Sequence, residues 1–265
     1  MASVTRELSP CAVDLRLDGG LEPARRLASE ALGDLPVDHC VQPLAHRRKR
    51  LLVADMDSTI INVECLDELA DFAGLKAEIS AITERAMRGE IEFEGALRER
   101  VGLLKDLSTE ALQRTYDERV RLNPGARILV RTMAANGARC LLVSGGFSFF
   151  TSRVAAVAGF QAERANTLIE AGGRLTGRVG EPILGREAKL RALIEEQAAL
   201  GIERAETLAI GDGANDLAMI GAAGLGVAYR AKPIVAAQAD AKVDHADLTA
   251  LLHFQGYGAE HFVTD

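Results

Sequence analysis

The stretch LLVADMDST, residues 51–59, places two carboxylates directly after four apolar residues. An apolar run of this length that follows a basic cluster is typical of a buried strand in a parallel sheet. Parallel α/β sheets bind their ligands at the carboxyl ends of the strands, which is where Asp55 and Asp57 stand. A rigid strand end can aim a carboxylate as a nucleophile, whereas an isolated Asp-x-Asp is more often a polar turn. The rest of the chain decides between these two interpretations.

Length, charge and cysteine content narrow the classes of protein that fit. The chain has 265 residues, 48% of them apolar, which suits one catalytic domain with an accessory piece. Its net charge of −7 argues against broad binding to nucleic acids or membranes. The four cysteines are widely spaced, and no apolar run has the length of a membrane span or the setting of a signal peptide. We therefore expect a cytoplasmic protein with reduced thiols.

Residues 1–48 are expected to form a separate N-terminal segment. Alternation predicts a strand over 12–17, helical spacing predicts a helix over 21–32, and a second short strand is predicted over 37–44. The resulting β-α-β fragment is too small to bury a core by itself. It must therefore dock on the rest of the chain or pair with another subunit, as in a homodimer.

From residue 49 to residue 265, predicted strands and helices alternate. This order indicates an α/β fold, a doubly wound and mostly parallel sheet. Between the first two core strands, helical spacing extends from about residue 64 to residue 122, the size expected of an inserted mobile cap. Later elements are a hairpin over 166–179 and a helix over 186–200.

Three predicted strands end in polar residues. These ends are Asp55 with Asp57, Ser144 with Gly145, and a third group made of Asp212, Asn215 and Asp216. Because the ends of parallel strands share one edge of a sheet, four carboxylates would converge there. Like charges at close range require a cation, and oxygen ligands without Cys or His favour Mg²⁺. Lys189 would add positive charge if its helix reaches the same edge.

Such a site suits the transfer of a phosphoryl group. Ser144 and the backbone N–H groups that follow it, at a helix start, would hold phosphate oxygens. An Asp is a plausible acceptor of the phosphoryl group. The chain has no Gly-x-x-x-x-Gly-Lys-Ser/Thr loop, so nucleotide-dependent transfer is not indicated.

In this order and spacing, the motifs resemble those of the haloacid dehalogenase (HAD) superfamily. The residues that carry the resemblance are Asp55-x-Asp57-x-Thr59, Ser144-Gly145-Gly146, Lys189 and Gly211-Asp212-Gly213-x-Asn215-Asp216. Within the superfamily, the chain is most similar to the phosphoserine phosphatases. Glu64-Cys65, residues 83–90, Phe93 and residues 97–101 add to that similarity. The resemblance covers residues 50 to about 250 and weakens before residue 48.

The resemblance implies an Mg²⁺-dependent hydrolase with a HAD-like, Rossmann-like fold. It would convert O-phospho-L-serine to L-serine and phosphate, the last step of serine biosynthesis, through an aspartyl-phosphate. Asp55 would be the nucleophile and Asp57 the general acid and base. The metal ligands that the resemblance implies are Asp55, Asp57 through its carbonyl, Asp212 and Asp216. The substrate-binding residues that it implies are Glu64, Met87, Phe93, Arg100, Ser144, Gly145, Lys189 and Asn215.

Several of these residues have ordinary structural interpretations when each is taken alone. Lys189 could be a solvated helix residue, and Arg100 could form ion pairs on a helix surface. Met87 and Phe93 could be plain core. Three other functions stay open: a related small-molecule phosphatase, a phosphotransferase that passes the phosphoryl group to homoserine, and a non-catalytic phosphate-sensing module.

Overall fold

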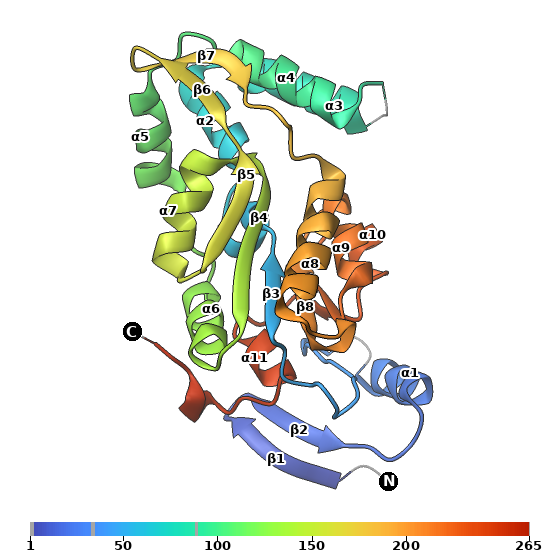
Figure 1. Ribbon diagram of the computed structural model, residues 1–265. Helices are drawn as coiled ribbons and strands as arrows, with labels where there is room; N and C mark the ends of the chain where they lie inside the picture. The colour runs from blue at the N-terminus through green and yellow to red at the C-terminus, as the bar shows by residue number, and fades with distance from the viewer. Residues whose placement is uncertain (1–2, 33–34, 88–89, 265) are drawn as a thin grey trace.

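The core of the computed structural model, which describes residues 3–32, 35–87 and 90–264, is a six-stranded parallel sheet (Figure 1). Its strand order is β10-β9-β8-β3-β4-β5, and every neighbouring pair is parallel. The strands are β3 (Leu51–Ala54), β4 (Arg139–Phe147), β5 (Ala162–Asn166), β8 (Thr207–Gly211), β9 (Leu225–Tyr229) and β10 (Ala241–Val243). The predicted α/β fold with a doubly wound, mostly parallel sheet is confirmed.

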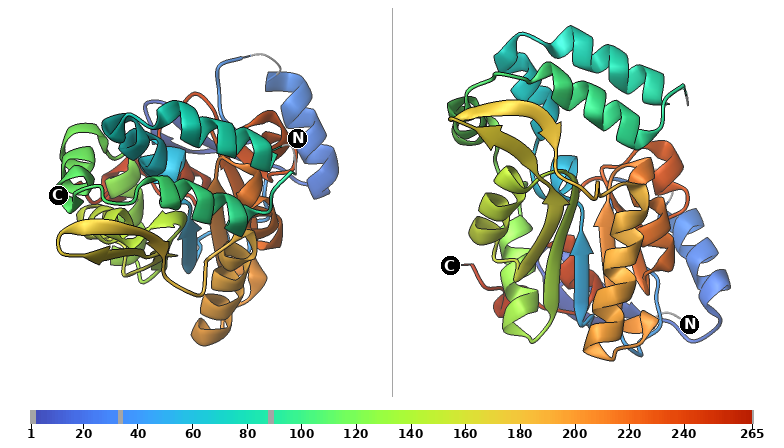
Figure 2. Two further views of the ribbon diagram at one scale, coloured as in Figure 1. Left: turned by 90° about the horizontal axis from the view of Figure 1, so that it is seen from above. Right: turned by 45° about the horizontal axis from the view of Figure 1, so that its top comes forward.

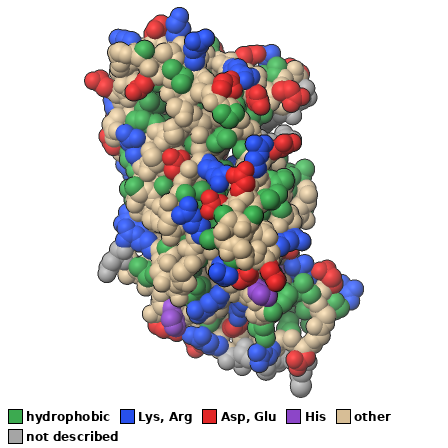
Figure 3. Space-filling view, in the orientation of Figure 1, with side chains coloured by type: hydrophobic (Ala, Val, Ile, Leu, Met, Phe, Trp, Pro, Cys, Tyr) green, Lys and Arg blue, Asp and Glu red, His purple; other side chains and the backbone are tan. Residues whose placement is uncertain are grey.

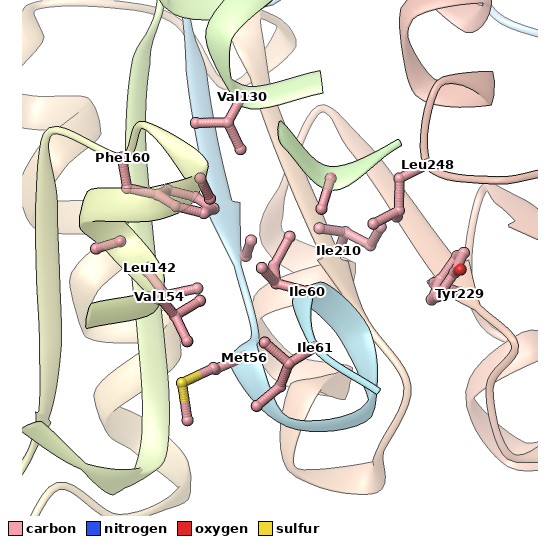
Figure 4. Packing of buried hydrophobic residues seen from close by; sticks show 14 of the residues in the cluster. Met56, Ile60, Ile61, Val130, Leu142, Val154, Phe160, Ile210, Tyr229 and Leu248 are labelled. Atoms are coloured by element: carbon pink, nitrogen blue, oxygen red, sulfur yellow. The ribbon is translucent and has the colours of Figure 1, made fainter. Parts of the chain in front are cut away.

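Helices cover both faces of this sheet, which explains why its central strand is apolar throughout. Leu52 and Ala54 face a hydrophobic cluster that includes side chains of α6 (Ala126–Ala135) and α7 (Ser148–Ala158). Leu51 and Val53 face a second cluster, built with α8 (Arg186–Leu200) and α9 (Leu217–Ala222). Figure 4 shows part of the first cluster, in which Val130 lies beside β3 and Leu142 and Val154 lie nearer the chain that follows it. Two short helices, α10 (Pro233–Ala236) and α11 (Ala250–Phe254), complete the core.

Four helices and a hairpin lie above the carboxyl ends of the core strands (Figures 1 and 2). The helices are α2 (Cys65–Ala73), α3 (Lys76–Met87), α4 (Phe93–Leu103) and α5 (Thr109–Arg119), all within the predicted helical insert. The hairpin predicted over 166–179 is also present, as β6 (Leu168–Ala171) and β7 (Arg174–Val179). Leu175 exchanges backbone hydrogen bonds with Asp106 and Leu107 at 2.9 Å each, so the hairpin is part of the cap.

The first residues form a hairpin and a helix at the end of the sheet opposite the cap (Figure 1). The hairpin pairs β1 (Ser3–Ser9) with β2 (Ala12–Arg16), and α1 (Leu21–Leu32) follows. The predictions over 12–17 and 21–32 are confirmed, but the strand predicted over 37–44 is wrong, because these residues form no strand. They are bound instead through side chains: Asp38 accepts from Ala246 N at 2.7 Å, and Gln42 donates to Phe254 O at 2.7 Å. The segment is therefore β-β-α, not β-α-β.

Candidate active site

The three predicted polar strand ends meet at one edge of the sheet. In the parallel register, Ala54 of β3 pairs with Ile210 of β8 on one side and with Leu142 of β4 on the other. Asp55 continues this ladder, because its backbone N–H donates to Ile210 O at 3.0 Å. The residues that follow these strands therefore start from the same level, as the sequence predicted.

Three carboxylates gather at this edge around a buried lysine. Asp55, Asp212 and Asp216 each offer one carboxylate oxygen, and these oxygens all lie within 4.8 Å of one another. Lys189 Nζ, on α8, lies 2.5 Å from Asp55 Oδ1 and 2.7 Å from Asp216 Oδ1. Lys189 is 3% exposed, so the interpretation as a solvated helix residue is wrong.

The protonation of this cluster follows from burial and charge. Burial, together with the charge of Asp216, raises the pKa of Asp55 well above its ordinary value, and Lys189 opposes this shift. Burial would lower the pKa of Lys189, but the carboxylates of Asp55 and Asp216 outweigh it and raise the pKa. One ammonium offsets only part of the charge of three carboxylates. The oxygen-only donor set therefore fits an additional hard cation such as Mg²⁺.

Gly211 at the end of β8 leaves room for one of these carboxylates. A side chain at this position would overlap the carboxylate of Asp216, which lies against the Gly211 backbone. Asp216 Oδ2 also accepts from Gly213 N at 3.1 Å, and Asp212 Oδ1 accepts from Thr59 Oγ1 at 3.4 Å. A side chain at Gly213 would likewise overlap Asn215 Oδ1, so close approach requires glycine at both positions.

The carboxylate of Asp57 is held by hydrogen bonds outside this cluster. The chain turns after β3, with Ser58 in the left-handed region at φ 56°. Asp57 Oδ1 accepts from Cys65 N at 2.9 Å, and Asp57 Oδ2 accepts from Ser144 Oγ at 3.1 Å. Burial raises the pKa of Asp57, although the hydrogen bonds from Cys65 and Ser144 oppose the shift. A raised pKa favours the protonated form of the carboxyl group, which is the form that acts as a general acid.

Glu64 and Arg100 bring opposite charges to a cleft of about 1340 Å³ between cap and core. Glu64 Oε1 accepts from Ser58 Oγ at 2.8 Å, and burial, with the charge of Asp57, raises the pKa of Glu64 to about 7. Within the described part of the chain, the guanidinium of Arg100 donates only to Ala96 O of its own helix, at 3.3 Å. Burial lowers the pKa of Arg100, and the carboxylates of Asp67 and Glu64 oppose this. Charged side chains of both signs gather where cap and core meet (Figure 3).

Phe93, the first residue of α4, lies over the last residues of β4. A methyl group added at Gly145 would lie 3.4 Å from Phe93 Cζ, and one at Gly185 would lie 3.6 Å from Phe93 Cδ1. The ring therefore covers two glycine-containing segments of the core at once. This contact makes Phe93 part of the wall of the cleft instead of plain cap core.

Comparison with known proteins agrees with this arrangement, because the haloacid dehalogenase-like hydrolase family matches residues 52–221. The chain belongs to this family. Phosphoserine phosphatase from Polaromonas sp. is 50% identical over 208 residues, which cover 77% of this chain and 88% of the relative. Phosphoserine phosphatase from Archaeoglobus fulgidus is 44% identical over 241 residues, 90% of this chain and 70% of the relative.

A solved structure of the same kind also matches the fold. It is described as a phospho-aspartyl intermediate analogue of phosphoserine phosphatase, and it aligns with a TM-score of 0.71 at 38% identity. The alignment covers 78% of this chain and 99% of the other. The resemblance of the sequence motifs to the HAD superfamily and to its phosphoserine phosphatases is thus confirmed.

The structure brings together nearly all of the residues singled out from the sequence. Those that line the cleft are Asp55, Asp57, Glu64, Phe93, Arg100, Ser144, Gly145, Asp212 and Asn215. Lys189 and Asp216 are buried against Asp55. The side chain of Met87, and Arg88 and Gly89 after it, lie outside what the structure describes. Sequence reasoning missed one buried polar residue beside this site, Asn166, which it treated only as the first residue of a hairpin.

Proposed function

We propose that this protein hydrolyses O-phospho-L-serine to L-serine and phosphate through an aspartyl-phosphate on Asp55. The observation that carries the proposal is that Asp55, which is paired with the buried Lys189, lines the same cleft as Glu64 and Arg100. The ammonium of Lys189 beside Asp55 suits a phosphate group. The carboxylate of Glu64 and the guanidinium of Arg100 suit the ammonium and carboxylate groups of an amino acid. The names of the relatives, and the phospho-aspartyl analogue among the solved structures, support the same reaction.

In the first step, a carboxylate oxygen of Asp55 attacks phosphorus. The bond between phosphorus and the serine oxygen breaks, and Asp57 gives its proton to that oxygen, so that serine leaves as a neutral alcohol. Ser144 donates to Asp57 Oδ2 at 3.1 Å and keeps the carboxyl group oriented. Lys189, at 2.5 Å from Asp55 Oδ1, would lower the charge that the phosphate meets.

In the second step, a water molecule attacks the phosphorus of the aspartyl-phosphate. Asp57, now deprotonated, takes one proton from this water as the bond between phosphorus and Asp55 breaks. Phosphate leaves, Asp55 regains its carboxylate, and Asp57 is again protonated for the next turnover. Both steps therefore use one carboxyl group in its two protonation states.

The proposed metal is Mg²⁺, held by the carboxylates of Asp55, Asp212 and Asp216 with the carbonyl of Asp57. The donor chemistry supports this, because three carboxylate oxygens lie within 4.8 Å of one another, and the ammonium of Lys189, which pairs with two of these carboxylates, offsets only part of their charge. When bound, the ion supplies positive charge to the phosphate oxygens. The proposed partners of the phosphate in this chain are Ser144, Gly145, Lys189 and Asn215.

Recognition of serine is proposed to rest on Glu64 for the ammonium group and Arg100 for the carboxylate. Phosphate release should be measured with O-phospho-L-serine, with phosphoethanolamine, which has no carboxylate, and with phosphoglycolate, which has no ammonium group. A hydrogen bond between charged groups contributes about 1.5–3 kcal/mol, so each incomplete substrate should lose about 10- to 100-fold in kcat/KM. Equal kcat/KM for the three compounds would contradict the proposal. Addition of homoserine, followed by a search for phosphohomoserine, tests the phosphotransferase alternative.

The raised pKa of Glu64 predicts a pH dependence of substrate capture. Only the ionised carboxylate attracts an ammonium group, and with a pKa of about 7 that form declines as the pH falls from 8 to 6. We expect kcat/KM for phosphoserine to fall by about tenfold in total over this range, because the ionised fraction of Glu64 falls by about that factor. Glu64→Gln should have a lower kcat/KM at pH 8 and a flatter profile. The substrate phosphate, which titrates near pH ~6, affects both proteins alike. Parallel profiles would show that another group is responsible.

We also propose that the protein works in the cytoplasm. All four cysteines are free thiols, as is usual where the surroundings keep thiols reduced. Across residues 3–32, 35–87 and 90–264, no helix combines the length and the apolar character needed to cross a membrane.

A further inference from the structure

Asn166 joins three segments of backbone beside the active site. It is the last residue of β5, where the chain leaves the core for the β6–β7 hairpin, and it is 2% exposed. Its Oδ1 accepts from Leu184 N at 2.7 Å, and its Nδ2 donates to Leu184 O at 3.2 Å. Leu184 stands where the chain returns from the hairpin to α8. The same Nδ2 donates at 2.9 Å to Gly145 O, close to the end of β4.

The bond to Gly145 fixes a peptide whose other side faces the catalytic groups. In a planar trans peptide, the C=O of Gly145 and the N–H of Gly146 point in opposite directions. The C=O points to Asn166, and the N–H donates to Ser144 Oγ at 2.8 Å. Ser144 Oγ in turn donates to Asp57 Oδ2 at 3.1 Å. A continuous series of hydrogen bonds thus runs from Asn166 to the carboxyl group of Asp57.

We propose that Asn166 is a positioning residue that orients Asp57 through the Gly145–Gly146 peptide and Ser144. This inference rests on the proposed function, since it assigns Asn166 a role in the acid and base chemistry of Asp57. Asn166 touches neither phosphate nor serine in this scheme. Its burial with three backbone hydrogen bonds makes it rigid, which is what a support for a catalytic group requires.

The same side chain links the end of β4 to the base of the cap. A mere staple for the hairpin would need only the two bonds to Leu184, whereas the third bond extends the link to Gly145. Phe93 of α4 lies against Gly145 and against Gly185, the neighbour of Leu184. The cap therefore rests on both of the segments that Asn166 joins, and their relative position is set by one amide group.

The first test replaces Asn166 and separates kcat from KM. Asn166→Ala removes all three hydrogen bonds, and Asn166→Asp keeps the side-chain volume while replacing the NH₂ group. Misplacement of a catalytic group by about 1 Å costs about 10²-fold, so we expect kcat to fall by about that factor. KM should rise by a smaller factor than kcat falls, because Glu64 and Arg100 are untouched and only two of the proposed phosphate partners, Ser144 and Gly145, lose support.

Gln161→Ala is the matched control, at the opposite end of the same two strands. Gln161 Oε1 accepts from Cys140 N of β4 at 2.7 Å, far along the strands from the cleft. Its replacement removes a side-chain bond between β4 and the start of β5, and wild-type kcat is expected. Loss of kcat in the control equal to that in the Asn166 variants would overturn the inference, because any loosening of these strands would then suffice.

A double-variant cycle tests the route through Ser144. If Asn166 acts through Ser144, then Asn166→Ala should cost little further activity in a Ser144→Ala background, because residues in one network are not additive. If the double variant loses kcat by the full product of the two single-variant factors, the inference is overturned. So would an unchanged kcat in folded Asn166→Ala and Asn166→Asp proteins, even with a lowered Tm.

A measurement without substrate keeps the inference separate from the proposed function. Amide exchange at Gly146 should be faster in either Asn166 variant than in the wild type or in Gln161→Ala, since the peptide has lost its support. Unchanged exchange would refute the inference whatever the enzyme hydrolyses. A wild type that releases no phosphate from phosphoserine would instead refute the proposed function, and the exchange data would still decide the role of Asn166.

Discussion

Asp55→Asn should reduce phosphate release from phosphoserine by about 10⁴-fold or more while the protein stays folded. The amide has the shape of the carboxylate but cannot attack phosphorus to give an acyl phosphate. Lys189 keeps its second partner, Asp216 Oδ1 at 2.7 Å, so the buried ammonium is not left unpaired. Steady-state phosphate release, circular dichroism and the mass of acid-quenched protein measure turnover, folding and the aspartyl-phosphate.

The matched control for this change is Asp106→Asn. Asp106 is exposed, lies outside the cleft and has φ 67°, a left-handed conformation that Asn tolerates well. The same chemical change there should leave turnover at the wild-type level. Turnover within about tenfold of wild type in Asp55→Asn, or a phosphorylated form of that variant, would contradict Asp55 as the nucleophile.

The convergence of the site could be predicted because it depends on a rule about sheets. Asp55, Ser144 and Asp212 each follow a buried apolar run, and the carboxyl ends of parallel strands share an edge. Neither the apolar runs nor the shared edge of the strands depends on a particular side-chain contact. The placement of Lys189 needed one more condition, that α8 point its first turns toward this edge, and the distance of 2.5 Å to Asp55 Oδ1 meets it.

What the sequence did not reveal depends on bonds to backbone atoms of distant residues. Asn166 bonds only to main-chain groups of Gly145 and Leu184, and main-chain groups are the same in every residue type. No pattern in the sequence therefore marks Asn166 apart from any Asn at a strand end. The error over residues 37–44 has a related cause: a short strand was predicted, but the segment is held by the side chains of Asp38 and Gln42.

The second large effect is expected on stability. Lys189→Met removes the ammonium but keeps much of the side-chain length, and it leaves Asp55 and Asp216 buried without the ion pairs that Lys189 forms with both of them. Breaking a buried ion pair in this way costs about 3–5 kcal/mol in the free energy of unfolding. Turnover should also be lost, since the phosphate would meet uncompensated carboxylates. Urea denaturation at pH 7.5 without divalent cations measures the loss.

The dependence of this loss on pH and Mg²⁺ identifies its cause. The folded-state pKa of Asp55 is already raised by burial, so its ionisation opposes folding as the pH rises through that pKa. Without Lys189 this penalty grows, so the deficit of Lys189→Met should shrink as the pH is lowered. Mg²⁺ should also reduce it, because a cation that binds only the folded state stabilises that state by mass action.

Lys76→Met, at an exposed lysine, is the control and should lose less than about 0.5 kcal/mol. A deficit in Lys189→Met that changes with neither pH nor Mg²⁺ would mean that lost packing, not unpaired carboxylates, destabilises the variant.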